Sequence, residues 1–285
     1  MTDNRGAPPD GGPQLERAGR RPHSVVSIWY LWDMGRAHYG ERPAPPGLGL
    51  ACVWSHSAPG DATEPHVQRV APDACIDLIW SDWDGDVHVA GPDTGPFLAG
   101  IPPGGRLAGV RFRPGLAAAA LGVPADALTD SRVSLRALWG GAAGALAATV
   151  AETAGAGGDP AATLTRAVAA RWRAAGPVDP AAPALASALI EDGSVRAAAL
   201  RLGLSERQLR RRSLAAFGYG PKTLQRILRF QRALALARAG TPAADVAYAT
   251  GYADQAHLAH EVRELAGVPL TELTGPAAIA PAASR

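Results

Sequence analysis

The chain has 285 residues, of which 47% are hydrophobic and 19% charged, and its formal net charge is +2. This length has room for about two domains, and two cysteines exclude a disulfide-stapled scaffold. No run reaches the roughly 18 apolar residues that a membrane-spanning helix needs, and the polar, Gly- and Pro-rich N-terminus is unlike a secretory signal. We therefore expect a cytoplasmic protein that does not use a membrane as partner.

The charges are unevenly distributed along the chain. Residues 61–93 hold eight acidic side chains and one basic one, whereas residues 196–238 hold eleven basic side chains and one acidic one. A solvated helix face usually mixes both signs, whereas a stripe of arginine suits the phosphates of a duplex. The basic segment therefore favours double-stranded DNA as a partner.

The N-terminal half predicts a β-rich domain. Residues 1–22 are polar and predict a disordered tail. Short apolar or alternating runs, broken by Gly, Pro and Asp, predict the strands that follow. Strands at this spacing are typical of an antiparallel barrel or sandwich. The predicted strands cover residues 24–32, 50–55, 75–80, 87–89 and 106–112.

After Pro114 the pattern becomes Ala- and Leu-rich with helical spacing. Ser134 is the predicted N-cap of the second helix, and Gly140 interrupts it. Three prolines within residues 176–183 predict an extended linker, and we place the domain boundary there. The predicted helices cover residues 115–121, 135–154 and 161–174.

Two copies of one pattern follow, each a short helix, a tight turn and a second helix. They occupy residues 197–212 and 245–262, and a basic helix over residues 221–240 joins them. One such match is weak evidence, because short connections between helices occur in any bundle. Two matches in the same orientation predict a DNA-binding regulator, in which the second helix of each unit enters the major groove.

Local signals define the ends of these helices. Ser194 and Ser205 are predicted N-caps, Gly203 and Gly251 are predicted turn residues, and Pro221 is predicted to begin the connecting helix. The predicted helices of this part include residues 184–191, 195–202, 221–240, 243–250 and 254–266.

The candidate DNA contacts are side chains on the exposed faces of these helices. Arginine can bind guanine through two hydrogen bonds and glutamine can bind adenine, although half to two-thirds of protein–DNA hydrogen bonds go to the backbone. For Arg207 and Arg211, base reading and phosphate binding both stay open. The candidates are Arg207, Gln208, Arg210, Arg211, Lys222, Arg226, Arg229, Gln255, Ala256, His257 and His260.

Three stretches, LGLSERQLRRR, GYGPKTLQRILRFQRAL and AYATGYADQAHLAHEVRELAGVPL, carry a family resemblance. They resemble the DNA-binding domain of the AraC/XylS family of bacterial transcription regulators, and the resemblance extends over about residues 184–273. The resemblance implies two helix-turn-helix units, set by a rigid linker helix into successive major grooves. It carries DNA contacts over to Arg207, Arg210 and Arg211 in the first unit and to Ala256, His257 and His260 in the second. RNA polymerase becomes a candidate partner.

Two positions depart from the family's pattern. Ser213 stands where a buried Phe is usual, and we expect it to loosen the packing of the first recognition helix. His260 stands where Arg is common, which predicts weaker or pH-sensitive phosphate binding. Because Ala256 offers a base only a methyl group, we expect the first unit to carry more of the sequence reading.

The N-terminal phrases VAPDACIDLIW, GVRFRPG and LGVPADALTD resemble the amino-terminal domain of one branch of these regulators, which is loosely related to cupin-like sensor barrels. The expected fold class is α+β. A cupin-like β-barrel domain with a helical extension covers residues 23–175. An all-α DNA-binding domain follows over residues 184–275, and residues 276–285 form a tail.

Three interpretations of the N-terminal domain stay open. A small-molecule sensor would use an aromatic-lined mouth with a few polar groups. A cupin-like metal site or enzyme would use Cys52, His56, His66, Cys75 and His88, whose spacing matches no metal rule, and a reactive thiol at Cys52 or Cys75 is weaker still. A dimerisation module would pair the helices between residues 115 and 174 in a homodimer. We expect no enzyme, no cofactor and no bound metal. The effector candidates are Trp54, Asp73, Asp77, Trp80, Arg111 and Arg113.

Overall fold

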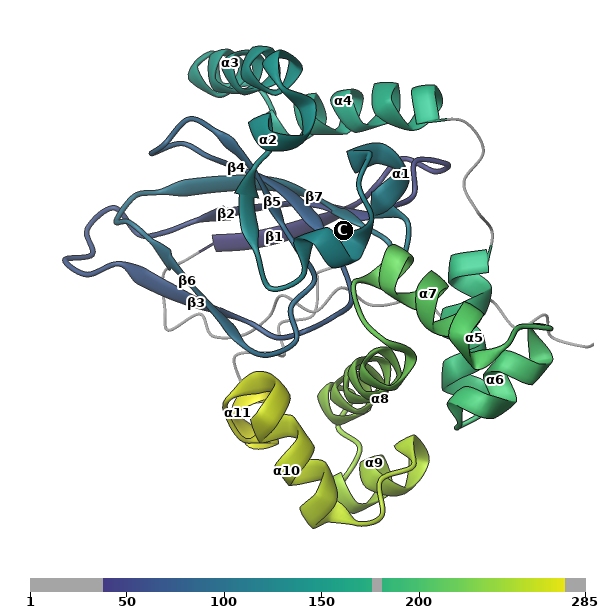
Figure 1. Ribbon diagram of the computed structural model, residues 1–285. Coiled ribbons are helices and arrows are strands. Elements are labelled where there is room, and N and C mark those ends of the chain that lie inside the picture. Colours follow the sequence, from purple (N-terminus) through teal and green to yellow (C-terminus); the bar gives the residue numbers. More distant parts are fainter. Residues whose placement is uncertain (1–37, 176–180, 275–285) are drawn as a thin grey trace, which may run out of the picture.

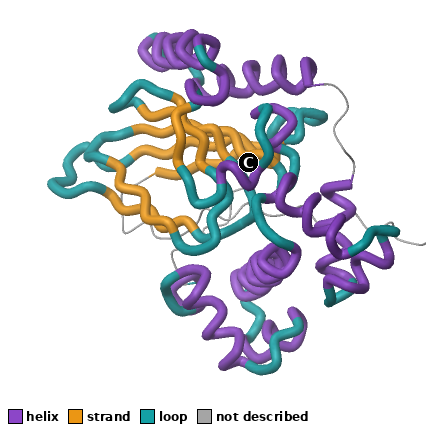
Figure 2. The backbone as a smooth tube through the Cα atoms, viewed as in Figure 1, coloured by secondary structure: helices purple, strands orange, loops and turns teal. Residues whose placement is uncertain are grey.

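The computed structural model describes residues 38–175 and 181–274. The first range contains the strands and the second is helical (Figure 1; Figure 2), so the predicted α+β class is confirmed. The two predicted tails and the strand predicted at residues 24–32 lie outside the described residues. No helix in the described ranges is long and apolar enough to cross a membrane.

The sheet-bearing part is built on an antiparallel sheet of six strands within the described residues. Successive side chains point to opposite faces, as the period of a strand requires. Leu78 and Val110 are fully buried on the face covered by helices. The strands, in spatial order, are β1 (His38–Pro43), β2 (Leu50–Ser57), β7 (Arg106–Phe112), β4 (Asp77–Ser81), β5 (Val87–Ala90) and β8 (Arg132–Ser134).

A second, smaller sheet pairs β3 (His66–Val70) with β6 (Phe97–Ile101) in antiparallel register. It faces the six-stranded sheet, and side chains from both sheets enclose a cavity. The two facing sheets give the barrel-like arrangement that the sequence predicts.

Helices cover the opposite face of the six-stranded sheet (Figure 1). They share one apolar core with the strands, which includes Phe112, Leu135 and Leu164. The elements are α1 (Ala117–Leu121), a short 3-10 helix (Ala125–Leu128), α2 (Arg136–Trp139), α3 (Gly141–Gly155) and α4 (Pro160–Ala175).

Several sequence predictions for this part needed correction. Strands β1, β3, β6 and β8 were not predicted. Gly140, which has a φ of +56°, divides the helix predicted at residues 135–154 into α2 and α3, so the predicted interruption is a complete break. Ser134 ends β8 instead of capping a helix, and Leu135 is the N-cap residue of α2. The Ser134 hydroxyl still accepts a hydrogen bond from the Arg136 backbone N–H at 3.3 Å.

The helical part contains seven helices within the described residues. Helix α5 begins at Ala181, inside the predicted linker, because Pro183 falls in its first turn, where backbone N–H groups have no helical partner. A short helix, α11, follows Pro269 and was not predicted. The helices are α5 (Ala181–Glu191), α6 (Val195–Arg201), α7 (Glu206–Phe217), α8 (Pro221–Arg238), α9 (Ala243–Thr250), α10 (Gln255–Ala266) and α11 (Leu270–Leu273).

Loops from the sheet-bearing part contact the helical part. Ala71 and Ala74, between β3 and β4, belong to the core of the helical part. The Gln231 side-chain amide on α8 donates to the Pro72 carbonyl. The Tyr219 hydroxyl, between α7 and α8, donates to the Asp93 carbonyl at 2.6 Å. The two parts are therefore packed together beside the α7–α8 junction.

A second contact lies at the end of α10. The Arg69 guanidinium on β3 donates to the Ala266 carbonyl at 3.2 Å. A cation at a helix C-terminus interacts favourably with the partial negative charge there. The sheet-bearing part thus touches both α10 and the α7–α8 junction.

Candidate nucleic-acid interface

The first helix-turn-helix unit consists of α6 and α7. Ser194 caps α6, and Gly203 adopts the left-handed conformation in the turn, with a φ of +65°. The Ser205 hydroxyl accepts a hydrogen bond from the Gln208 backbone N–H at 3.2 Å. Leu209 and Phe217 anchor α7 in the core. The predicted caps and turn of this unit are confirmed.

The second unit consists of α9 and α10 and repeats the same construction. Gly251 has a φ of +76°, and the Asp254 carboxylate accepts a hydrogen bond from the His257 backbone N–H at 2.7 Å. Leu258 and Val262 bury one face of α10. Between the two units, α8 begins at Pro221 as predicted.

Two predicted DNA contacts also stabilise helix starts. In α7 the side-chain amide oxygen of Gln208 accepts a hydrogen bond from the Ser205 backbone N–H at 2.9 Å, which completes a capping box. In α10 the His257 Nδ1 accepts from the Ala253 backbone N–H at 3.3 Å, and its ring meets Tyr252 edge-on. Reading a base with either side chain would compete with these local bonds.

The side chains of Arg226 and Arg229 extend from α8 toward α10. Arg226 Nε donates to both carboxylate oxygens of Glu261, at 3.0 and 2.8 Å, and its guanidinium also pairs with Glu264. The Arg229 guanidinium lies 4.4 Å from the Tyr252 ring centre and 3.5 Å from Glu261. We call Arg226, Arg229, Glu261 and Tyr252 the α8–α10 bracket. The arginines were predicted from sequence as DNA contacts, and the structure gives them partners within the protein.

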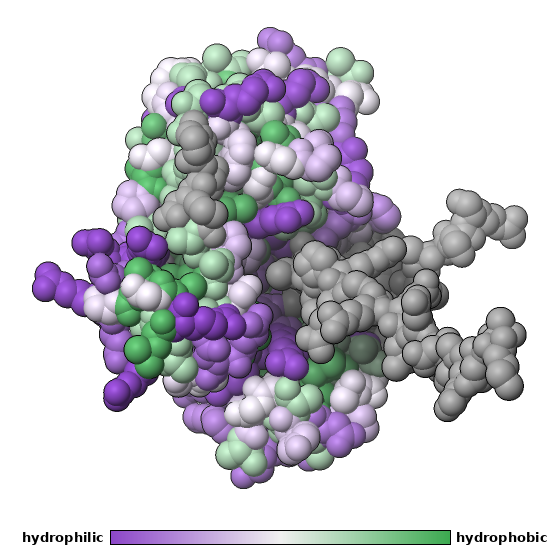
Figure 3. All heavy atoms as spheres, turned by 90° about the vertical axis from the view of Figure 1, so that its right-hand side faces the viewer, coloured by the Kyte–Doolittle hydropathy of each residue, from purple (hydrophilic) through white to green (hydrophobic). Residues whose placement is uncertain are grey.

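The remaining candidates project into solvent. Seen from the side of α5 and α6, hydrophilic side chains stand out from the molecule (Figure 3). His260 is exposed, and its Nε2 lies 3.2 Å from a Glu264 oxygen. The other exposed candidates are Arg207, Arg210, Arg211, Lys222, Gln255 and Ala256.

A basic groove runs between α6, α7 and α8. Arg196, Lys222 and the two bracket arginines line it, with Glu206 as its acidic member. Such a groove can hold the phosphates of a nucleic-acid backbone.

Ser213 does not leave a gap in α7. It is fully buried, and its hydroxyl donates to the Tyr219 carbonyl at 2.7 Å. The predicted loose packing is therefore wrong, because Ser213 forms a hydrogen bond that links α7 to the α7–α8 junction.

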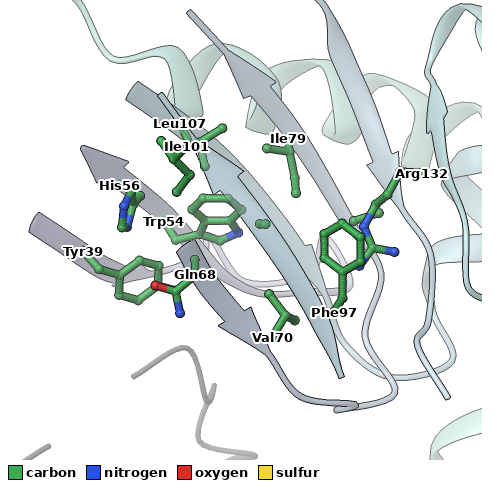
Figure 4. Close-up of a pocket in the computed structure, with 12 residues that line it drawn as sticks. Tyr39, Trp54, His56, Gln68, Val70, Ile79, Phe97, Ile101, Leu107 and Arg132 are labelled. Carbon is green, nitrogen blue, oxygen red and sulfur yellow. The ribbon is translucent and has the colours of Figure 1, made fainter. Parts of the chain in front are cut away.

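The cavity between the two sheets is the candidate effector site. Its volume is about 50 Å³. Side chains from both sheets point toward it (Figure 4). Residues at alternate positions of a strand share a face. His56, two residues after Trp54 on β2, could therefore have been predicted from the sequence as a further lining residue. The lining residues are Tyr39, Trp54, His56, Gln68, Val70, Ile79, Ala90, Phe97, Ala99, Ile101, Leu107 and Arg132.

Four of the six predicted effector residues come together beside this cavity. Arg111 is fully buried and pairs with Asp77 at 3.2 Å and with Asp73 at 3.8 Å. The Trp54 indole donates to Asp77 at 2.8 Å, and its ring lies over Gly109, where a Cβ would meet it at 2.3 Å. Burial raises the pKa of Asp77 to about 6, although Arg111 opposes this shift. We call Asp73, Asp77 and Arg111 the buried charge cluster.

The other two predicted effector residues lie elsewhere. Trp80 is buried in the core on the helix-covered face, because it alternates with Ile79 along β4. Arg113 is exposed and donates to the Leu50 carbonyl at 3.1 Å. Neither residue lines the cavity.

The metal and thiol alternatives gain no support. The described ranges contain no group of three or more His, Cys, Asp or Glu that could hold a metal ion. Cys52 and Cys75 are both buried, and burial raises the pKa of the Cys75 thiol. A raised pKa disfavours the reactive thiolate.

Two family models match the chain. Residues 198–275 match a helix-turn-helix domain, and residues 49–134 match a domain of unknown function, DUF6597. No curated protein matches.

Distant structural likenesses exist to ToxT from Vibrio cholerae. A crystal structure from strain O395 is 11% identical, with a TM-score of 0.40 over 74% of this chain and 98% of that one. An apo variant from strain SCE256 is 12% identical, with a TM-score of 0.41 over 82% of this chain and 100% of that one.

The helix-turn-helix match spans both units described above. Residues 198–275 therefore form a helix-turn-helix domain, a class in which the second helix of a unit enters the major groove of DNA. This C-terminal domain is of the AraC type, as the sequence resemblance predicted.

Proposed function

We propose that this protein is a sequence-specific transcription regulator that binds double-stranded DNA through α7 and α10 and responds to a small effector. The pair of matching helix-turn-helix units joined by α8 carries the proposal. At 1.5 Å per residue, the 18 residues of α8 span about 27 Å. One turn of DNA is about 34 Å, so α8 together with the units at its two ends is long enough to reach successive major grooves.

The exposed side chains divide into proposed base readers and proposed backbone contacts. Arg207, Arg210 and Arg211 lie on the first recognition helix and are the proposed readers. Lys222, in the basic groove, is a proposed phosphate contact. The bracket arginines are proposed to orient α10 relative to α8.

Effector control is supported by the contacts between the two parts. Arg132 and Phe97 line the cavity, and Arg132 is held by both carboxylate oxygens of Asp93 at 2.9 and 2.7 Å. The Asp93 carbonyl accepts the hydrogen bond from Tyr219. A ligand that shifts Arg132 would therefore act on a residue bonded to the α7–α8 junction.

RNA polymerase and a second copy of the chain are further proposed partners. Leu200 on α6 and Tyr248 on α9 occupy equivalent places, three residues before Gly203 and Gly251, and are 73% and 91% exposed. Exposed apolar side chains of this size suit contact with another protein better than contact with solvent. Sedimentation analysis, alone and with RNA polymerase, tests both partners.

The DNA proposal is tested by selecting preferred duplexes from a random pool and measuring affinity over a salt series. Arg207→Ala should reduce the discrimination between selected and random duplex by about tenfold, as loss of one base contact of 1–3 kcal/mol implies. Arg173→Ala on α4 removes the same charge outside both units and serves as the matched control. Equal affinity of the wild-type protein for selected and random duplexes at moderate salt would refute the proposal.

A further inference from the structure

The walls of the cavity between the two sheets suit an uncharged ligand. The rings of Tyr39, Trp54 and Phe97 face it, and aliphatic side chains fill most of the remaining wall (Figure 4). Aromatic rings pack well against a flat apolar molecule.

Four of the five polar side chains that line the cavity form hydrogen bonds within the protein, and the fifth, His56, is in ring contact with Tyr39 and His66. The Tyr39 hydroxyl donates to Glu41 at 2.6 Å, the Trp54 indole donates to Asp77, and Arg132 is held by Asp93. The Gln68 amide donates to the Arg69 carbonyl at 3.1 Å. A charged ligand would lose its hydration and gain no uncommitted partner among these groups, whereas an apolar ligand gains by leaving water.

The size of the cavity limits the ligand and identifies the wall that must move. A volume of about 50 Å³ holds a few water molecules, whereas an apolar cavity that binds benzene measures about 150 Å³. Strands β3 and β6 form their own sheet, outside the hydrogen-bonded order of the larger sheet. The outer face of this pair carries Val67 and Leu98, which are more than half exposed. Among the described residues, no core therefore packs against the outer face of this pair.

We propose that the cavity binds a small, uncharged molecule with a single ring, admitted by outward movement of β3 and β6. This inference rests on the proposed function, in which the cavity is the effector site. Arg69 on β3 is hydrogen-bonded to the last turn of α10. Strand β6 begins at Phe97, four residues after Asp93, whose carbonyl accepts the hydrogen bond from Tyr219. Ligand entry would thus strain the contacts that fix both recognition helices.

Binding of three single-ring probes to the full-length protein tests the proposal. Benzyl alcohol, benzoate and benzylamine share one ring and differ in charge at neutral pH. Calorimetric titration should show saturable binding of benzyl alcohol, at least tenfold tighter than either charged probe. Equal or tighter binding of benzoate or benzylamine, or no saturable binding of benzyl alcohol, would overturn the proposal.

Two variants of β6 locate the site. Ala99→Leu adds side-chain volume inside the cavity and should weaken benzyl alcohol binding at least tenfold. Leu98→Ala changes the neighbouring residue on the exposed face and should leave binding within twofold of wild type. Unchanged binding by Ala99→Leu, with a thermal unfolding transition showing that it folds, would place the ligand elsewhere and refute the inference.

DNA binding of the same preparations, measured without probe, separates this inference from the proposed function. Selective DNA binding without benzyl alcohol binding would refute only the ligand inference. Benzyl alcohol binding without selective DNA binding would refute the proposed function.

Discussion

Replacing Glu261 with Gln is expected to loosen the α8–α10 bracket. The Glu261 side chain is only 12% exposed, whereas Arg226 and Arg229 are 32% and 31% exposed. Hydrogen bonds to charged groups contribute about 1.5–3 kcal/mol, and solvent screening of the partly exposed arginines reduces this value. We therefore expect Glu261→Gln to lower the free energy of unfolding by about 1–2 kcal/mol, measured by urea denaturation.

The same substitution should change DNA binding in two opposite directions. It removes a negative charge and releases two arginines, so affinity for random duplex and its salt dependence should rise. Because α10 is held less firmly, discrimination between selected and random duplex should fall. Gel shifts over a salt series measure both quantities. Glu272→Gln removes the same charge from the exposed face of α11 and is the control. Equal unfolding midpoints for the two variants would refute a stabilising role for the bracket.

Three further substitutions test other contacts. Tyr219→Phe removes the hydrogen bond to the Asp93 carbonyl and should lower the free energy of unfolding by about 1 kcal/mol, whereas a midpoint equal to wild type would show that this bond contributes nothing. Ser205→Ala removes the cap of α7 and should cost about 1 kcal/mol in urea denaturation, most of which Ser205→Thr should restore. Because burial raises the pKa of Asp77 to about 6, this carboxyl stabilises the fold most at low pH, and its contribution is lost as pH rises from about 4 through 6. Asp77→Asn should flatten that part of the profile of unfolding free energy against pH, and an unchanged slope would contradict the assignment.

The helix ends of the DNA-binding part were predictable because their causes are local. Ser205 caps α7 by accepting a hydrogen bond from the backbone N–H three residues later. Gly203 and Gly251 adopt the left-handed conformation in the two turns. Pro221 begins α8 where its missing N–H has no cost. Each signal lies within a few residues of the structure that it determines.

Strands β3 and β6 could not be predicted from local signals of this kind. Strand β3 is short, and its outer residues Val67 and Arg69 mix apolar and charged character. Strand β6 contains Ala99 and Gly100, which give little apolar alternation. These strands pair with each other across about 30 residues of chain, so their pairing depends on tertiary contacts that short-range patterns do not contain.

The cavity could be predicted only in part for the same reason. Trp54, Asp77 and Arg111 were identified by residue type, and the structure brings them together by strand pairing. Trp80 was placed with them because its strand was predicted without a facing direction, and the alternation along β4 puts it on the opposite face. Phe97 and Arg132 enter the cavity from strands that the sequence did not reveal.

The structure also changes the reason for expecting the two helix-turn-helix units to contribute unequally to base recognition. The sequence attributed the difference to His260 and Ala256 in the second unit, although it also predicted looser packing of the first recognition helix. In the structure, Ser213 is hydrogen-bonded, so the first helix is firmly held. His257 is bound to its own helix start and His260 lies beside Glu264, which leaves the second unit few uncommitted polar side chains. The first unit keeps three exposed arginines even after Gln208 is used as a cap. We therefore expect base changes in the half-site read by α7 to weaken binding more than changes in the half-site read by α10.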